Sequence, residues 1–340
     1  MPDESSRGDW LRNVSGMAGR KSGDPAPNIG RPLELAAGDR PAAAGGSAKP
    51  ASGLRGKALQ PGQLFHHFQV EQELGRGATA TVYRAVDQNT GGIVALKMLS
   101  LADDWPDDLL EEAKLRLLRE AEAAGSLAHP DIVEIRESGE HQGLVYLAME
   151  YVQGVNLGMH ATEGRLLPPR LAAEMCARVA DALYFAHQRG IIHRDIKPAN
   201  IVFDKQNRRV RVMDFGVARL VDSRATRTGV ILGSPSYMSP EQLDARPVTA
   251  QSDIFSLGVT LFQLLTGMLP FRSDSIPGLM QKISAEPHPP LRVVRPDLPA
   301  SLGTVIDRAL EKDPELRYRS GAEMAQALRD AAREVDPSIR

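Results

Sequence analysis

Side chains that can act on a phosphate group are concentrated in one short stretch of the sequence. Asp195, Lys197 and Asn200 lie within residues 193–200, and apolar runs flank this stretch on both sides. A carboxylate can accept the proton of a hydroxyl group, and an ammonium group can stabilise charge on a transferring phosphoryl group. Another carboxylate, Asp214, follows Asn200 by 14 residues and comes directly after a strand-like run. The spacing indicates one site built from two neighbouring segments.

A glycine-rich turn and a lysine precede these segments. The turn at 75–82 lies between two strand-like runs, whereas Rossmann and P-loop glycine motifs open a helix. A strand–loop–strand turn can close its backbone N–H groups over phosphates, but a tight hairpin explains the glycines about as well. Lys97 ends an apolar strand-like run, where a buried lysine needs an anionic partner. The alternative for Lys97 is a place on an edge strand.

The elements that must position these residues change in type along the chain. Strand-like runs are predicted at 68–71, 81–86, 93–97, 132–138, 144–150 and 210–213, with a helix at 107–127. After Gly154 the apolar spacing becomes helical, at 168–189, 253–267, 275–284, 300–311 and 321–335. The pattern predicts an α+β fold with a small β-rich lobe that contains one helix and a larger α-helical lobe.

Taken together, these motifs resemble those of bacterial serine/threonine protein kinases, the Hanks-type, eukaryotic-like family. The resemblance covers about residues 68–328 and rests mainly on the segments 193–200 and 214–216. Ser239-Pro240-Glu241 looks like the family's Ala-Pro-Glu, Asp253 opens a run similar to its buried core helix, and Arg317 matches the arginine that pairs with the Glu241 position. The resemblance implies a bilobal kinase-like domain at 62–335, with an N-lobe at 62–150, a hinge at 150–154 and a C-lobe at 155–335.

The resemblance also assigns catalytic roles. Asp195 is expected to accept or orient the proton of the substrate hydroxyl, and Lys197 to stabilise the transferring phosphoryl group. A lysine at position 197 is typical of serine/threonine rather than tyrosine kinases. Lys97 is expected to hold the α- and β-phosphates of ATP and to be held by Glu120 of the predicted helix. Neighbouring glutamates such as Glu122 leave open the alternative that Glu120 is a solvated helix residue.

The expected cofactors are ATP and Mg2+, with Mn2+ as an alternative ion. Asp214 and Asn200 are the expected metal ligands, because oxygen donors suit Mg2+. The resemblance places the ATP contacts in the glycine-rich turn, the adenine pocket and the hinge, where plain core packing predicts many of the same residue types. These contacts are Gly75, Arg76, Gly77, Ala78, Thr79, Ala80, Val82, Ala95, Lys97, Met149, Glu150, Val152 and Val202.

The segment 214–241 resembles an activation segment with a polar middle. Arg194 and Arg219 could bind a phosphate on Thr226 or Thr228 through charge-assisted hydrogen bonds. Autophosphorylation is therefore predicted at one or both threonines. The alternative is an unmodified loop whose threonines keep it soluble.

Three further positions refine the resemblance. His193 is expected to pack against Phe215 rather than to act as a base. Ala80 stands at the third glycine position of the turn, where a methyl group is the smallest substitution. Ser234 stands where the family often has threonine, and it keeps a hydroxyl group that can bridge the two catalytic side chains.

Composition limits the other functions. The 340 residues include 41 Lys plus Arg and 43 Asp plus Glu, so the net charge of -2 argues against a general nucleic-acid binder. Cys176 is the single cysteine, which excludes an intrachain disulfide and fits a reducing cytosol. Residues 1–61 are rich in Gly, Pro and Ala and are predicted to form a disordered arm. No apolar stretch is long enough to span a bilayer, and a cytoplasmic location is predicted.

The sequence therefore predicts a non-specific serine/threonine protein kinase that acts on protein substrates. A transient homodimer is the expected means of trans-autophosphorylation. Two alternatives remain, a catalytically silent kinase-like scaffold and a small-molecule phosphotransferase on the same fold. Such scaffolds usually lack an equivalent of Lys97, Asp195 or Asp214, and this chain has all three. The activation segment argues against the phosphotransferase.

Overall fold

The computed structural model describes residues 58–77, 80–99, 107–215 and 235–339. All the described residues belong to one compact unit, Gly53–Arg340. The predicted arm at 1–61 therefore lies almost wholly outside the described residues. Six residues with predicted roles also lie outside the described residues, namely Ala78, Thr79, Arg219, Thr226, Thr228 and Ser234.

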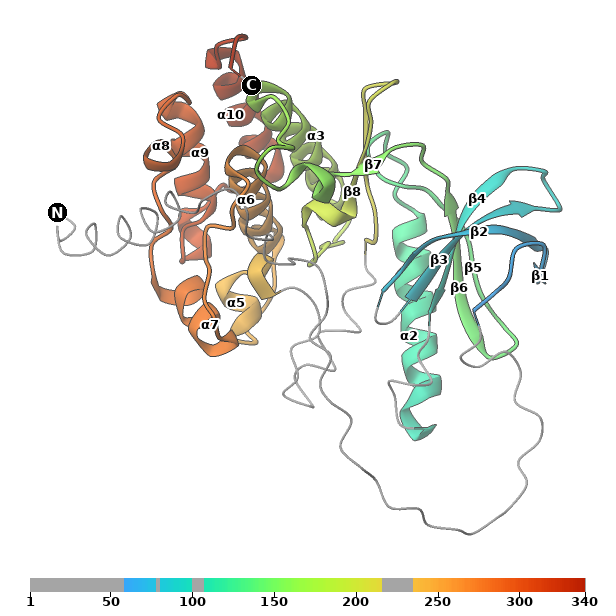
Figure 1. The fold of residues 1–340 in the computed structure, drawn as a ribbon. Helices are drawn as coiled ribbons and strands as arrows, with labels where there is room; N and C mark the ends of the chain where they lie inside the picture. The colour runs from blue at the N-terminus through green and yellow to red at the C-terminus, as the bar shows by residue number, and fades with distance from the viewer. Residues whose placement is uncertain (1–57, 78–79, 100–106, 216–234, 340) are drawn as a thin grey trace. The chain divides into compact units, whose positions relative to one another are not determined.

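An antiparallel sheet of six strands forms the first part of the domain (Figure 1). Its strands are β1 (Leu64–Phe65), β2 (Phe68–Arg76), β3 (Ala80–Asp87), β4 (Ile93–Leu99), β5 (Ile135–His141) and β6 (Leu144–Glu150), in the order β1-β2-β3-β4-β6-β5. Each pair of neighbouring strands is antiparallel. The predicted β-rich lobe is thus confirmed, with β1 as an additional short edge strand.

One helix, α2 (Asp107–Gly125), packs against this sheet. Leu110, Ala113, Leu117 and Ala121 recur at helical spacing and contact Val145, Leu147 and Met149 of β6. Side chains alternate across a strand, so the residues between them on β6 pack into a separate apolar cluster on the other face. This two-sided burial explains why β6 reads as a continuous apolar run.

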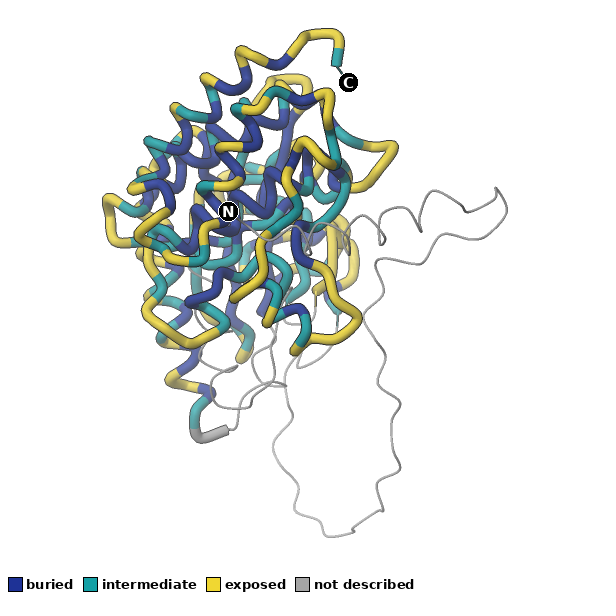
Figure 2. The backbone as a smooth tube through the Cα atoms, turned by 90° about the vertical axis from the view of Figure 1, so that its left-hand side faces the viewer, coloured by how far each residue is buried: buried dark blue, intermediate teal, exposed yellow. Residues whose placement is uncertain are grey.

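The second part of the domain is helical. Its longer helices are α3 (Pro169–His187), α6 (Ala250–Thr266), α7 (Ile276–Ala285), α9 (Ala300–Ala309) and α10 (Gly321–Glu334). The short ones are η1 (Leu157–His160), η2 (Pro198–Asn200), η3 (Pro235–Tyr237), α5 (Pro240–Leu243), α8 (Leu291–Val294) and η4 (Pro314–Leu316). In Figure 2 the buried residues follow the helices through this part. Among the described residues, no helix is both long and apolar enough to cross a membrane.

Close contact between helices depends on small residues. The α3 helix buries a row of alanines together with Cys176, whose thiol is fully buried. Gly321 begins α10 so near to α3 that a Cβ atom there would lie 2.2 Å from the Ala180 carbonyl oxygen. The α6 helix is buried on nearly all sides, as expected for a helix in the centre of a core.

A second sheet of three short strands carries the segments that the sequence singles out. Its strands are β7 (Val155–Asn156), β8 (Ile201–Asp204) and β9 (Arg209–Val212), in that order. The β8 strand begins after Asn200, and β9 ends two residues before Asp214. The strand predicted at 132–138 begins at Ile135 instead, because the backbone of 132–133 pairs with Val212 of β9.

Candidate active site

The carboxylate of Asp195 is held by two neighbouring side chains. Lys197 Nζ lies 2.7 Å from Asp195 Oδ2, and Asn200 Nδ2 donates to the same oxygen at 2.9 Å and to the Asp195 carbonyl oxygen at 2.8 Å. The Asp195 side chain remains 35% exposed, whereas Asn200 is buried. This arrangement fixes a reachable carboxylate in one orientation, which suits a general base.

The backbone of this segment is anchored from the first turn of α6. The fully buried Asp253 carboxylate accepts hydrogen bonds from the backbone N–H groups of His193 at 2.8 Å and Arg194 at 2.7 Å. Arg194 has a φ of +70°, an uncommon conformation for a residue other than glycine. Burial alone would raise the pKa of Asp253, but the hydrogen bond and charge of His187 lower it below its usual value. Asp253 thus stays ionised and holds the segment in shape.

Lys97 and Asp214 come together from segments that are far apart in the sequence. Lys97 Nζ on β4 lies 2.6 Å from Asp214 Oδ1, just beyond β9. Burial would raise the pKa of Asp214, but the charge and hydrogen bond of Lys97 lower it below its usual value. Asp214 is therefore an anion. It lies beside the Asp195 segment, because the N–H of the preceding residue, Met213, donates to the Asn200 carbonyl oxygen at 2.9 Å.

The expected pairing of Lys97 with Glu120 is not present in this structure. Lys97 pairs with Asp214, and Glu120 accepts a hydrogen bond from Arg116 Nε at 3.2 Å, one turn away on α2. The physical reason is that the inward-facing Asp214 carboxylate needs a cation and Lys97 supplies it. Glu120 does lie on the predicted face of α2, since Leu117, Ala121 and Ala124 are buried.

The donor atoms of Asn200 and Asp214 fit a hard divalent cation. The Asn200 amide nitrogen donates to Asp195, so its remaining polar atom is the carbonyl oxygen Oδ1. Asp214 adds an ionised carboxylate. An amide oxygen and a carboxylate are typical ligands of Mg2+.

His193 is occupied as a structural residue. Its buried ring meets the Phe215 ring edge-on, with the centroids 4.6 Å apart. Its Nε2 lies 2.7 Å from the Met213 carbonyl oxygen, and Nδ1 accepts the Asp195 N–H at 3.3 Å. Both ring nitrogens therefore contact the backbone, which matches the expected packing role rather than that of a base.

The residues expected around the nucleotide belong to neighbouring elements. Val82 on β3 faces Lys97 on β4, and Ala95 on β4 faces Met149 on β6. Val202 lies on β8. At the far end of the hinge, a Cβ on Gly154 would lie 2.6 Å from the Phe203 carbonyl oxygen, so this close approach requires glycine. In the glycine-rich turn, the Gly77 N–H donates to the Ala80 carbonyl oxygen at 2.8 Å, as in a tight hairpin.

The Glu241–Arg317 pair links the segment that begins at residue 235 to the rest of the helical part. Arg317 Nη1 and Nη2 lie 2.7 and 2.9 Å from the two Glu241 oxygens, and both side chains are buried. Ser252 donates to Glu241 Oε1 at 2.6 Å. Burial would raise the pKa of Glu241, but Arg317 and Ser252 lower it.

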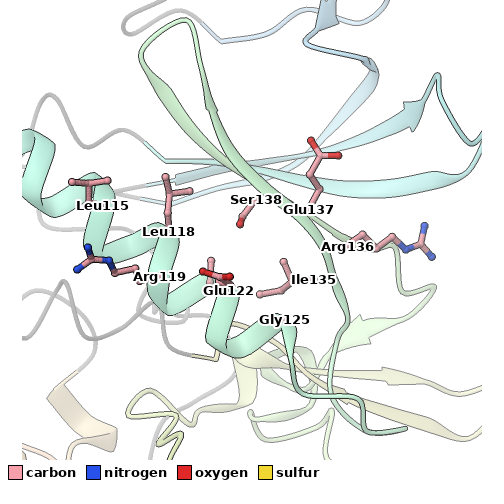
Figure 3. A pocket seen from close by; sticks show the side chains of 10 residues that line it. Leu115, Leu118, Arg119, Glu122, Gly125, Ile135, Arg136, Glu137 and Ser138 are labelled. Carbon is pink, nitrogen blue, oxygen red and sulfur yellow. The ribbon is translucent and has the colours of Figure 1, made fainter.

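Two features escape motif reasoning. His187 Nε2 lies 2.7 Å from Asp253 Oδ2 and orients that carboxylate. The only sign of such a partner in the sequence is that Asp253 lies in an apolar run, where a buried carboxylate needs one. A pocket of about 470 Å³ also lies between α2 and β5, lined by residues that include Leu118, Arg119 and Glu122 (Figure 3). None of its lining residues is an expected site residue.

Comparisons with known proteins agree with this geometry. The protein kinase domain family model matches residues 68–330. PknB of Mycolicibacterium smegmatis, a serine/threonine-protein kinase, is 40% identical over 278 residues, which cover 79% of this chain and 43% of PknB. The chain thus spans about two fifths of the length of the curated relatives it matches.

Solved structures show the same fold. The crystal structure of the Mycobacterium tuberculosis PknI kinase domain has a TM-score of 0.65 and 33% identity, and the match covers 81% of this chain and 100% of that one. Rad53 1-466 in complex with AMP-PNP has a TM-score of 0.64 and 25% identity, with 76% of this chain and 64% of Rad53 covered. The α+β bilobal fold, the motifs and the family model lead to one conclusion: this chain belongs to the protein kinase domain family.

Proposed function

We propose that this chain is an active serine/threonine protein kinase that transfers the γ-phosphoryl group of ATP to hydroxyl groups of protein substrates. The observation that carries the proposal is the Asp195 carboxylate, held by Lys197 and Asn200 while still exposed to solvent. A silent scaffold would not need to keep a base, a phosphate-binding lysine and two metal ligands in one place. The similarity to serine/threonine kinases such as PknB supports the choice of acceptor.

In the proposed mechanism Asp195 accepts the proton of the acceptor hydroxyl group as the oxygen attacks the γ-phosphorus, and the bond from the γ-phosphorus to the β–γ bridging oxygen breaks, so that ADP leaves. Lys197 Nζ, now 2.9 Å from Asp195 Oδ1, would turn toward the phosphoryl oxygens and stabilise their charge. Lys97 would hold the α- and β-phosphates, with Glu120 in place of Asp214 as the partner of its ammonium group. The bound Mg2+ supplies charge neutralisation of the phosphates, and Asp214 and Asn200 are its proposed ligands.

Regulation and location complete the proposal. Phosphate on Thr226 or Thr228, bound by Arg194 and Arg219, would order the activation segment after trans-autophosphorylation in a transient homodimer. Ser234 would bridge Asp195 and Lys197. We also propose a cytoplasmic location, which the single buried thiol of Cys176 supports.

The test compares the wild-type chain with Asp195→Asn and with the exposed control Asp274→Asn. Each is incubated with γ-labelled MgATP and a generic basic protein, and phosphorylated residues are identified by mass spectrometry. We expect transfer to Ser and Thr that falls by about 10²–10⁴-fold in Asp195→Asn and is unchanged in the control. Undiminished transfer by Asp195→Asn would refute the mechanism. ATP binding without any transfer by wild type would favour the scaffold.

A further inference from the structure

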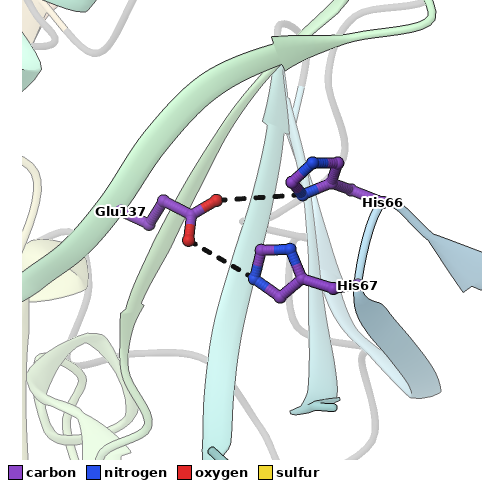
Figure 4. Close-up of side chains that lie close together, drawn as sticks. All are labelled: His66, His67 and Glu137. Atoms are coloured by element: carbon purple, nitrogen blue, oxygen red, sulfur yellow. Dashed lines mark ion pairs between the residues drawn. The ribbon is translucent and has the colours of Figure 1, made fainter. Parts of the chain in front are cut away.

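Two adjacent histidines and a glutamate meet on the six-stranded sheet, and none of them belongs to the active site described above. His66 and His67 form the turn between β1 and β2, and Glu137 lies on β5 (Figure 4). One ligand atom from each side chain lies within 4.8 Å of the other two. Within the described ranges this is the one such group of three His, Cys, Asp or Glu side chains. The sequence outside these ranges contains no His or Cys that could add to it.

The conformation of the turn places both imidazoles on the same side. Phe65 pairs with Phe68, so His66 and His67 form a two-residue hairpin turn. Side chains that follow one another in extended backbone point to opposite faces, but His66 has a φ of +56°. The two rings therefore lie with their centroids 4.4 Å apart. A positive φ favours Gly and Asn and also tolerates His, but only His66 of the pair has one, so the turn by itself does not require two histidines.

The carboxylate of Glu137 faces both rings. Its Oε2 lies 3.3 Å from His67 Nε2, and its Oε1 lies 3.9 Å from His66 Nδ1. The Tyr146 hydroxyl on β6 donates to Oε1 at 2.6 Å. A hydrogen bond from a neighbouring group is the usual way to orient a metal-binding carboxylate.

A second carboxylate near His67 already serves another purpose. Asp87 Oδ1 lies 3.6 Å from His67 Nε2. Its two oxygens accept hydrogen bonds from the Asn89 N–H at 2.9 Å and the Thr90 hydroxyl at 2.7 Å, which close the β3–β4 turn. Glu137 is therefore the carboxylate aimed at the histidine pair.

We propose that His66, His67 and Glu137 bind one divalent transition-metal ion of the zinc class. Two imidazoles and one carboxylate are an established ligand set for Zn2+, with bonds of about 2.0–2.2 Å, and the three donor atoms already lie within 4.8 Å of one another. Imidazole nitrogens prefer zinc, copper or nickel to magnesium, which distinguishes this site from the oxygen donors Asp214 and Asn200.

The ion would join two parts of the sheet that backbone hydrogen bonds do not. In the strand order β1-β2-β3-β4-β6-β5, the histidine turn lies at one edge and Glu137 at the other. The β2 strand starts directly after His67 and runs to Arg76 in the glycine-rich turn. Metal binding would therefore close the two edges of the sheet and stabilise the strand that leads into the glycine-rich turn.

The first experiment measures zinc binding by the full chain without nucleotide. The protein is stripped with a chelator and titrated with ZnCl2 against a chromophoric competitor, and the thermal unfolding midpoint is recorded with Zn2+ and with Mg2+. We expect one high-affinity Zn2+ per chain and a rise in the midpoint with Zn2+ but not with Mg2+. Absence of any Zn2+ uptake in competition with the chromophore would overturn the proposal.

Matched variants decide whether the bound ion occupies this site. Glu137→Gln and His66→Asn should each weaken Zn2+ binding by more than about tenfold, and Tyr146→Phe by about 10–100-fold. Asn suits the positive φ of His66, so this variant should fold at least as well as wild type without metal. Glu134→Gln and His160→Asn are the controls and should bind as wild type does. Zn2+ binding that is unchanged in Glu137→Gln and His66→Asn would refute the site.

Discussion

At the scale of single residues, the charges of the domain are sorted by how deeply they are buried. Asp195 is exposed enough to meet a substrate, whereas Asp253 and Glu241 are buried and bonded to fixed partners. All three side chains end in a carboxylate, but only the carboxylate of Asp195 has an orientation and an exposure that suit proton transfer. The proposed function therefore depends on which carboxylates remain exposed to a substrate.

The Glu241–Arg317 pair should contribute far more to stability than an exposed pair. Replacing Glu241 by Gln leaves the Arg317 charge buried without its anion, and we expect the free energy of unfolding to fall by about 3–5 kcal/mol. The control is Asp244→Asn, whose half-exposed carboxylate lies 3.1 Å from Arg246 and should contribute about 0–1 kcal/mol. Urea unfolding measures both. Equal effects of the two substitutions would contradict the prediction.

Acid should destabilise the domain through its lowered carboxyl pKa values. The pKa values of Asp214, Glu241 and Asp253 are all lowered in the folded chain. Each group therefore stabilises the fold above its unfolded pKa of about 4, and this contribution is lost as the pH falls through the lower folded pKa. Urea unfolding from pH 7 to pH 3 should show a progressive fall below about pH 5. A free energy of unfolding that stays constant down to pH 3 would contradict this.

At the scale of elements, the position of α2 bears on which carboxylate pairs with Lys97. Lys97 contacts Asp214 here, although the sequence predicts its partner to be Glu120. A small pocket lies beside Asp214, lined by Ala124 of α2, Leu147 and Met149 of β6, and Phe215. A shift of α2 toward β4 would allow Lys97 to exchange one carboxylate for the other.

This exchange predicts a kinetic effect without a large effect on stability. Glu120→Gln should lower the rate of phosphoryl transfer by at least tenfold, because Lys97 would lose its anionic partner in the active arrangement. A tenfold loss is roughly what the loss of one charge-assisted hydrogen bond costs. The thermal unfolding midpoint should change little, since Lys97 pairs with Asp214 in this structure. The matched control is Glu122→Gln, on the exposed side of the same helix. A transfer rate in Glu120→Gln equal to that of the control would show that Glu120 has no such role.

The spacing of apolar residues predicted most of the helices and strands, because their apolar faces are long enough for a regular spacing to be recognised. The helices α3, α6, α7, α9 and α10 and the strands β2–β6 all appear within a few residues of their predicted ranges. The strands β1 and β7 have two residues each, too few for any alternation to be read. The later start of β5 depends on backbone pairing between residue 132 and Val212, a long-range contact that no local pattern encodes.

The site was predictable to a similar extent. Asp195, Lys197, Asn200 and Asp214 come together as their spacing suggests, because β8 and β9 form a short hairpin between the two segments. The choice between Asp214 and Glu120 as the partner of Lys97 depends on where a whole helix sits. Motif spacing does not determine that position.

At the scale of the whole molecule, the folded domain begins before the family match does. The match starts at Phe68, but Leu59 and Phe65 are buried against the sheet, and the Leu59 N–H donates to the Tyr83 hydroxyl at 3.1 Å. A chain that starts at residue 58 therefore keeps these contacts. One that starts at residue 68 should lose about 1.5–3 kcal/mol for each of the two apolar side chains.

Chemical denaturation of the three lengths tests this prediction, and the exposed Leu64 offers a point control. Leu64 is 58% exposed, so Leu64→Ala should have little effect, whereas Leu59→Ala should destabilise the full chain. If the chain starting at residue 68 were as stable as the full chain, residues 58–67 would be an appendage rather than part of the domain.

The single cysteine has a practical consequence. Cys176 is buried among the alanines of α3, and burial raises the pKa of its thiol to about 12, so it should not react with maleimides while the domain is folded. The wild-type sequence is thus already suited to site-specific labelling. One cysteine introduced on α2 and a second on β5 would carry a fluorophore pair or two spin labels without further mutation, and their separation would report the movement of α2 in solution.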